Sequence, residues 1–410
     1  MSGKVLHILS QRPGKTGSGV TLDALVRQAG TAGWHQKALV GIPVSETTPR
    51  VGELPAADIE TVTFRAGFGP AGEDLPFPVP GMSDVMPYPS SVWSHLSPGD
   101  LAAYRTVWSH RIGEVVRGFQ PDIIQTNHIW LMSSLVPDAA PGVPIVAACH
   151  ATGLRQMELT PHLRDEVIAG CRRIDRFSVL RNDHRDTLAA TLQVDPGRIA
   201  VTQAGYRDEL FHPLPAGDGP SPGHVLYVGK YSATKGLPWL LDAVERLAPD
   251  HPGLRLHIAG GGAGTEAEAL RARMEDLVPL VTMHGQLDQP ALADLMRRCA
   301  VCVLPSFYEG VPLVLVEAAA CGCRLVSTDL PGVREQIAPG LDPVIRLVEL
   351  PRLENVDQPV AADLPRFTAN LASALADALD RPPESPPDLD AFTWESVFRR
   401  TESIWRELGG

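Results

Sequence analysis

The 410-residue sequence contains no long apolar run, few cysteines and no excess of basic residues. A membrane-spanning helix needs about 20 consecutive apolar residues, so we expect none here. The apolar part of the N-terminal segment "MSGKVLHILSQRP" is too short for a signal peptide, and it predicts a first strand instead. We therefore expect a cytoplasmic protein.

The net charge of −12 argues against general binding to nucleic acid. One stretch is rich in arginine, but acidic residues interleave with it, which is typical of a solvated helix face. A site for an anionic group or a membrane surface is the minority alternative, so membrane association is not expected but stays open. The arginines of this stretch are Arg155, Arg164, Arg172, Arg173, Arg176, Arg181 and Arg185.

The six cysteines include two close pairs, Cys299 with Cys302 and Cys321 with Cys323, and this spacing raises the question of zinc. Cys302 lies in the apolar run "AVCVLP", which predicts a buried strand, and the second pair separates a helix from the next strand. Four ligands on regular core elements rarely converge, so we interpret these residues as small buried side chains. No Asp-x-Asp motif occupies a plausible strand end either, and we expect no metal site.

Short apolar runs alternate with longer amphipathic stretches along most of the chain. Runs such as "PDIIQT" (121–126) and "PIVAAC" (144–149) are typical of strands buried on both faces of a parallel sheet. The alternation predicts an α/β fold of two Rossmann-like, doubly wound domains facing a central cleft. We assign 1–211 to the first domain, which the helix 391–410 completes, then a linker (212–223) and a second domain (224–390).

A segment from Ala66 to Ser97 interrupts the alternation. It is rich in proline and glycine, yet it also carries Phe77, Met82, Met86, Tyr88 and Trp93. Loops of this length in a compact domain are usually functional or disordered, and the apolar residues favour a folded flap.

The stretch "RPGKTGSGV" (12–20) ends like a phosphate-binding P-loop but lacks its first glycine, because Leu9 stands there. Gly17 and Gly19 still lie between the first strand and the first helix. Small residues there let a phosphate approach backbone N–H groups, although a plain glycine-rich turn explains the pattern about equally well.

The second half carries a sharper pattern. Lys230 follows a predicted strand and Lys235 precedes a helix, so the two could neutralise a diphosphate. In "PSFYEGVPLVLVEAAACG", Glu309 and Glu317 are eight residues apart, one in a turn and one in the following helix. Gly310 and Val311 offer backbone N–H groups at the start of that helix. Anion binding beside two carboxylates suits a polyhydroxylated anion such as a sugar nucleotide.

These motifs resemble those of the retaining glycosyltransferases of family 4 (glycosyl transferases group 1), which have the GT-B fold. "VGKYSATKG" is similar to their Val-Gly-Arg…Lys-Gly segment, and "PSFYEGVPLVLVEAAACG" to their Glu-x7-Glu signature. "STDLPGVREQI" and "CHATGL" also fit. The likeness is strong over 224–336 and looser before.

The resemblance implies a role for each matched residue. Lys230 and Lys235 would bind the donor diphosphate, Glu317 the ribose and Glu309 the donor sugar. The Gly17–Gly19 loop would lie against the diphosphate, and His150 beside the sugar. Lys230 departs from the usual arginine, which keeps the charge but loses the bidentate fork. Two further residues, Ala204 and Arg155, lie outside the matched pattern. We assign no role to Ala204.

The resemblance therefore implies a retaining, metal-independent glycosyltransferase with His150, Lys235 and Glu309 at its catalytic centre. Its donor would be a nucleotide-diphosphate sugar, with UDP favoured, and it would need no further cofactor. From charge and composition we expect a small, soluble, anionic acceptor, selected by Arg155 and the 66–97 flap. Two alternatives stay open: a sugar-nucleotide epimerase or hydrolase of the same fold, and a non-catalytic subunit that binds a sugar nucleotide.

Overall fold

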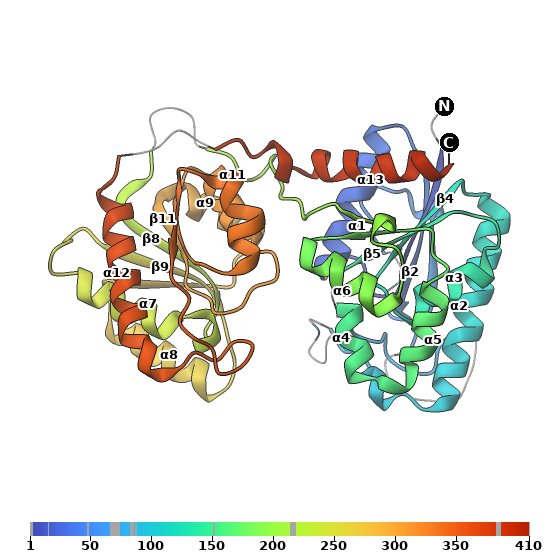
Figure 1. Ribbon diagram of the computed structural model, residues 1–410, viewed down its shortest axis with the longest axis horizontal. Coiled ribbons are helices and arrows are strands. Elements are labelled where there is room, and N and C mark those ends of the chain that lie inside the picture. The colour runs from blue at the N-terminus through green and yellow to red at the C-terminus, as the bar shows by residue number, and fades with distance from the viewer. Residues whose placement is uncertain are drawn as a thin grey trace. The chain divides into compact units, whose positions relative to one another are not determined.

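The chain forms two compact units, which span 1–204 with 394–410 and 205–393 (Figure 1). The computed structural model describes residues 3–14, 16–46, 49–65, 74–82, 86, 88–150, 152–213, 219–382 and 387–409. Each unit is built on one sheet in which every strand pairs in parallel. The final helix, α13 (Trp394–Gly409), returns the chain to the first unit.

The first unit has seven strands in the order β3-β2-β1-β4-β5-β6-β7, the doubly wound arrangement that the alternation predicts. Its strands are β1 (Lys4–Leu9), β2 (His35–Pro43), β3 (Ile59–Phe64), β4 (Ile123–Asn127), β5 (Ile145–Cys149), β6 (Arg176–Val179) and β7 (Ile199–Val201). Its other helices are α1 (Gly17–Thr31), α2 (Pro98–Phe119), α3 (Leu131–Ala139), α4 (Thr152–Leu159), α5 (Pro161–Cys171) and α6 (Asn182–Leu192).

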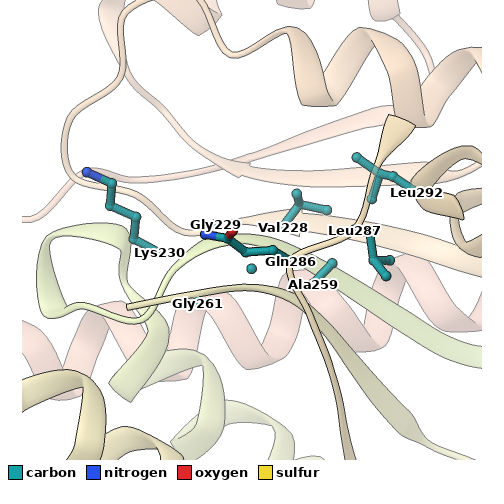
Figure 2. Close-up of a pocket in the computed structure, with 9 residues that line it drawn as sticks. Val228, Gly229, Lys230, Ala259, Gly261, Gln286, Leu287 and Leu292 are labelled. Carbon is teal, nitrogen blue, oxygen red and sulfur yellow. The ribbon is translucent and has the colours of Figure 1, made fainter. Parts of the chain in front are cut away.

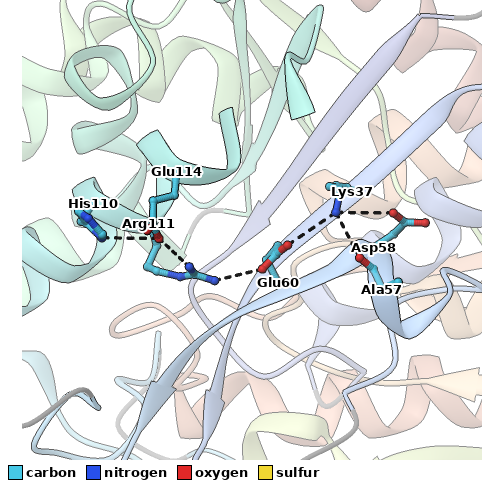
Figure 3. Close-up of polar contacts among 7 residues, drawn as sticks. All are labelled: Lys37, Ala57, Asp58, Glu60, His110, Arg111 and Glu114. Carbon is cyan, nitrogen blue, oxygen red and sulfur yellow. Dashed lines mark hydrogen bonds and ion pairs between the residues drawn. The ribbon is translucent and has the colours of Figure 1, made fainter. Parts of the chain in front are cut away.

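Two hydrophobic layers enclose this sheet. Helices α1 and α13 cover one face, where Trp405 packs among Val5, Ile123 and Val146. Helices α2, α3 and α5 cover the other face. Ion pairs also hold α2 to the edge strand β3, because Arg111 binds both Glu60 (3.1 Å) and Glu114 (2.6 Å) (Figure 3).

The described part of the 66–97 segment packs into the second of these layers. Phe77, Met82, Tyr88 and Trp93 are all buried there, and Trp93 contacts the ring of Tyr104 edge-on at 5.2 Å. Residues 66–73, 83–85 and 87 lie outside the described residues. These large apolar side chains are therefore part of the core of the first unit.

The second unit has six strands in the order β10-β9-β8-β11-β12-β13. Its strands are β8 (Ser221–Lys230), β9 (Arg255–Gly261), β10 (Val281–Gly285), β11 (Cys299–Leu304), β12 (Arg324–Thr328) and β13 (Ile345–Val348). Its helices are α7 (Leu237–Leu247), α8 (Thr265–Asp276), α9 (Gln289–Arg298), α10 (Leu313–Ala320), α11 (Ala338–Leu341) and α12 (Leu364–Asp380). Strand β8 begins inside the segment that the composition predicts as linker, and residues 214–218 of that segment lie outside the described residues.

Helices α7, α8 and α12 cover one face of this sheet, and α9, α10 and α11 the other. The four clustered cysteines are buried in the latter layer, and the thiol of Cys323 lies 3.2 Å from the carbonyl oxygen of Met296. Within the described ranges, no group of three or more His, Cys, Asp or Glu side chains is arranged to hold a metal ion. Nor is any described helix long and apolar enough to cross a membrane.

Candidate active site

Lys235 and Glu309 meet at the carboxyl ends of two neighbouring parallel strands, β8 and β11. The Nζ atom of Lys235 lies 2.8 Å from Oε1 of Glu309 and donates a second hydrogen bond to the Tyr308 carbonyl oxygen at 3.2 Å. Their side chains are 26% and 18% exposed, so a ligand can reach both. The structure thus joins two residues that lie 74 positions apart in the sequence.

A glycine explains how the lysine turn comes so close to β11. Gly236 has a φ of +71°, and a Cβ atom there would lie 2.0 Å from the Pro305 carbonyl oxygen. Any other residue would be strained and would push the turn away from the end of β11. Gly236 therefore fixes the position of Lys235 relative to Glu309.

Lys230 lies at one end of a pocket of about 340 Å³ at the carboxyl ends of β8 and β9 (Figure 2). Backbone forms much of its floor, because a Cβ atom at Gly260 would come within 1.9 Å of the Gly229 carbonyl oxygen. Lys230 itself is exposed. The remaining residues that line the pocket are Val228, Gly229, Ala259, Gly260, Gly261, Gln286, Leu287 and Leu292.

Glu317 lies in the second turn of α10 and is half-buried. Burial raises the pKa of its carboxyl group from 4.5 to about 7. A carboxyl group whose pKa lies near neutral pH is typical of a functional site, although structural carboxyl groups can also have shifted pKa values.

Gly310 and Val311 lie before α10 and not in its first turn. The helix begins at Leu313 with Pro312 at its N-cap, and the Leu313 N–H donates to the Val311 carbonyl oxygen at 2.9 Å. Proline has no N–H and its fixed φ suits the start of a helix, which sets this boundary. The N–H groups of Gly310 and Val311 therefore belong to the loop that carries Glu309.

In the first unit, the two glycines of the β1–α1 turn differ. The N–H of Gly19 donates to the Thr16 side chain at 3.3 Å, and a Cβ atom at Gly19 would lie 2.6 Å from the Gly14 nitrogen. The close approach to Gly14 thus explains why residue 19 is a glycine. The N–H group of Gly19 is already bonded to Thr16, the N-cap of the helix. Gly17 is exposed, and a Cβ atom there would meet no atom within 4 Å. Gly17 is therefore the stronger candidate for contact with a phosphate. Lys15 lies outside the described residues.

His150 follows β5, and its Nε2 lies 3.2 Å from Oδ1 of Asn127 at the end of β4. Burial lowers the pKa of His150 to about 4, so its ring is neutral at neutral pH. The ring of His128 lies beside it, with 5.1 Å between the ring centroids.

The sequence analysis did not assign His128, Asn127 or Gln11, which complete this edge of the sheet. His128 has a φ of +71°, an unusual conformation for a residue other than glycine. Its Nε2 lies 3.0 Å from Oε1 of Gln11 and its Nδ1 3.1 Å from Oγ1 of Thr152. A signal was present, because the polar letters "NH" follow directly on the strand expected over 121–126.

Arg155 lies exposed on α4. Several of the other arginines bond within the first unit. Arg172 donates to the Leu192 carbonyl oxygen at 2.6 Å, Arg173 pairs with Asp138 at 2.7 Å, and Arg181 pairs with Asp183. This favours a structural role for the arginine-rich stretch.

Comparisons with known proteins identify the fold class and the family of this chain. Sucrose-phosphate synthase from Thermosynechococcus elongatus superposes with a TM-score of 0.61 at 18% identity, over 99% of both chains. Anabaena HepE, solved with UDP and glucose, gives a TM-score of 0.59 at 15% identity, over 99% of this chain and 100% of its own. Such likeness shows the fold, which is that of the GT-B glycosyltransferases.

Two family profiles match consecutive parts of the sequence: Glycosyltransferase Family 4 over 52–210 and Glycosyl transferases group 1 over 222–353. The chain belongs to this family of glycosyltransferases. A glycogen synthase from Mycobacterium tuberculosis is 28% identical over 70% of this chain and 69% of its own. A D-inositol 3-phosphate glycosyltransferase from Streptomyces coelicolor is 26% identical over 86% of this chain and 84% of its own.

Proposed function

We propose that this glycosyltransferase retains the anomeric configuration of the sugar that it transfers and needs no metal ion. Its donor is a nucleotide-diphosphate sugar, with UDP favoured, and its acceptor is a hydroxyl group of a small anionic molecule. The contact between Lys235 and Glu309 is the observation that carries this proposal.

The pair combines the two groups that such a donor requires. A diphosphate accepts hydrogen bonds and carries negative charge, whereas a sugar presents hydroxyl donors. In the absence of ligand, Glu309 holds the ammonium group of Lys235 in place at 2.8 Å. When the donor binds, the lysine turns its remaining proton to the diphosphate, and the carboxylate accepts from the sugar. Each partner thus orients the other for the group that it binds.

The pocket beside Lys230 suits the nucleoside portion of the donor. It is concave, it has apolar walls formed by Val228, Leu287 and Leu292, and Lys230 places a positive charge at its rim. Glu317 accepts hydrogen bonds from the ribose when it is ionised. The exposed backbone at Gly17 leaves room for a phosphate at the start of α1.

Retention follows a front-face route in this proposal. The sugar–phosphate bond breaks, the acceptor hydroxyl attacks the same face, and the leaving phosphate takes the proton of that hydroxyl. Lys230 and Lys235 stabilise the negative charge that grows on the diphosphate as the bond breaks. In other enzymes a divalent cation supplies this stabilisation, and here the two ammonium groups replace it.

The acceptor assignment is supported by charge and by relatives. Arg155 is exposed on the helix that follows His150, and a planar guanidinium suits a phosphate or carboxylate. Several relatives are named as D-inositol 3-phosphate glycosyltransferases, whose acceptor is a small phosphorylated polyol. We therefore propose a small anionic polyol as the acceptor class.

The test is to incubate the protein with UDP-, GDP- and ADP-sugars, with and without a panel of phosphorylated polyols and sugars. We expect release of nucleoside diphosphate that depends on the acceptor, and NMR of the product should show the anomeric configuration of the donor. Release of free sugar without any acceptor would indicate a hydrolase, and inversion of the anomeric centre would refute the retaining mechanism.

A further inference from the structure

We propose that Asn127 positions His150 so that its ring offers a hydrogen-bond acceptor, Nδ1, to a hydroxyl group of the transferred sugar. Asn127 is then a positioning residue that acts through His150 and helps to determine which sugars are transferred. This inference rests on the proposed function, since it places the donor sugar beside His150.

The orientation of the Asn127 amide follows from its backbone partner. Its Nδ2 atom lies 3.3 Å from the Ile8 carbonyl oxygen in the adjacent strand β1. A carbonyl oxygen only accepts hydrogen bonds, so the NH2 group of the amide must face it. Oδ1 of Asn127 must therefore face His150.

The same reasoning fixes the tautomer of His150. Its Nε2 lies 3.2 Å from Oδ1 of Asn127, and an amide oxygen only accepts, so Nε2 must carry a proton. A neutral imidazole has one N–H, so Nδ1 carries a lone pair. Among the described residues, Nδ1 of His150 has no hydrogen-bond partner, and the ring is partly exposed.

The surroundings keep this ring neutral. Burial lowers its pKa to about 4, and a proton on His150 would also face the ring of His128 at 5.1 Å. His128 is itself buried, and its pKa is lowered well below the usual value by burial and then by the charge of a protonated His150. Asn127, unlike an aspartate, supplies no negative charge that would stabilise an imidazolium.

The chemical consequence is selectivity for a donor group. A lone pair at Nδ1 accepts from a sugar hydroxyl, but it repels the carboxylate of a uronic acid, and a deoxy or fluoro position gives it nothing to accept. A protonated ring would have the opposite preference. The identity of the residue at position 127 therefore selects hydroxylated over acidic sugars.

The first test needs no variant. Two-dimensional NMR of the nitrogen-labelled protein, with His150 assigned by its loss in His150→Gln, reports which ring nitrogen carries the proton. We expect the Nε2–H tautomer, with no protonation down to about pH 5. A proton on Nδ1 at neutral pH would overturn the inference, and this result does not depend on whether the proposed function is correct.

The second test is Asn127→Asp, which keeps the size of the side chain and adds a charge. The aspartate should raise the pKa of His150 and convert Nδ1 into a donor at low pH. Relative to wild type, we expect kcat/KM for the donor to fall about tenfold at pH 6 and to recover to within about twofold at pH 9. Asn182→Asp is the matched control, because it makes the same change at an exposed position in the first unit. Its ratio to wild type should not change with pH. An equal loss at both pH values in Asn127→Asp would show a merely structural role.

The third test uses the active donor with single hydroxyl groups replaced by hydrogen or fluorine. One position should lose about tenfold in kcat/KM with wild type, and it should lose almost nothing with His150→Ala. If all positions lose equally in both proteins, the ring does not contact the sugar. If no nucleotide sugar is turned over at all, the proposed function fails, whereas the tautomer measured by NMR stands.

Discussion

Replacing Glu317 with glutamine should make the second unit more stable, and the gain should grow with pH. Burial raises the pKa of this carboxyl group from 4.5 to about 7. Between these two values the folded protein keeps a proton that the unfolded chain has lost. Wild type therefore loses stability as the pH rises through this window, and its stability is greatest below it. Glutamine is uncharged and removes this dependence.

The size of the effect follows from the shift. A tenfold change in a proton-binding equilibrium corresponds to about 1.4 kcal/mol, so a rise of the pKa from 4.5 to about 7 limits the whole effect to about 3 kcal/mol. Most of it falls between pH 5 and pH 8, where the linkage relation gives about 2–3 kcal/mol. The stability gained in Glu317→Gln should thus be small at pH 5 and about 2–3 kcal/mol larger at pH 8.

The assay is a urea series at each pH, read by hydrogen exchange in peptides of β11 and α10, which reports the second unit by itself. Glu335→Gln, at an exposed position in the same unit, is the control. If the difference between Glu317→Gln and wild type is the same at pH 5 and pH 8, the carboxyl group is ionised normally and the argument for a poised Glu317 is wrong.

Three further predictions concern the donor and the acceptor. Lys235→Ala and Glu309→Ala should stay folded, because both side chains are partly exposed. In each variant kcat should fall by about 10²–10³. Wild-type rates with the true donor would refute the assignment of both residues. Arg155→Ala should raise KM for the acceptor and leave KM for the donor unchanged, as steady-state kinetics can show; an equal rise in both would contradict an acceptor role. The protein should not sediment with anionic liposomes. Tight, salt-sensitive sedimentation that disappears when the charges of Arg172, Arg173 and Arg176 are reversed would refute the soluble-acceptor proposal.

Much of the fold could be read from periodicity. The apolar runs over 121–126 and 144–149 form β4 (Ile123–Asn127) and β5 (Ile145–Cys149), to within two residues at each end, because continuous apolar runs of this length are typical of strands buried on both faces of a sheet. The sequence analysis did not assign α12 or β13. Strand β13 is only four residues long, and α12 follows a long connection, so neither continues the regular alternation.

The candidate site was only partly predictable for a different reason. Lys235 and Glu309 lie in short turns after strands, where the motif and the parallel topology both indicate function. The contact between Asn127 and His150 depends on hydrogen bonds that join β1, β4 and the end of β5. The spacing of residues in the sequence does not reveal which polar atoms face each other. Likewise, only the packing of Gly19 against Gly14 distinguishes it from Gly17.

The central claim is that the second unit binds a nucleoside diphosphate through lysines and without metal, and calorimetry in EDTA tests it most directly. UDP, GDP and ADP are titrated in turn into wild type and into Lys235→Ala. We predict that at least one of them, with UDP favoured, binds wild type with one site per chain, and that Lys235→Ala binds it about tenfold or more weakly. Failure of all three to bind in EDTA, with binding restored by magnesium, would contradict the claim.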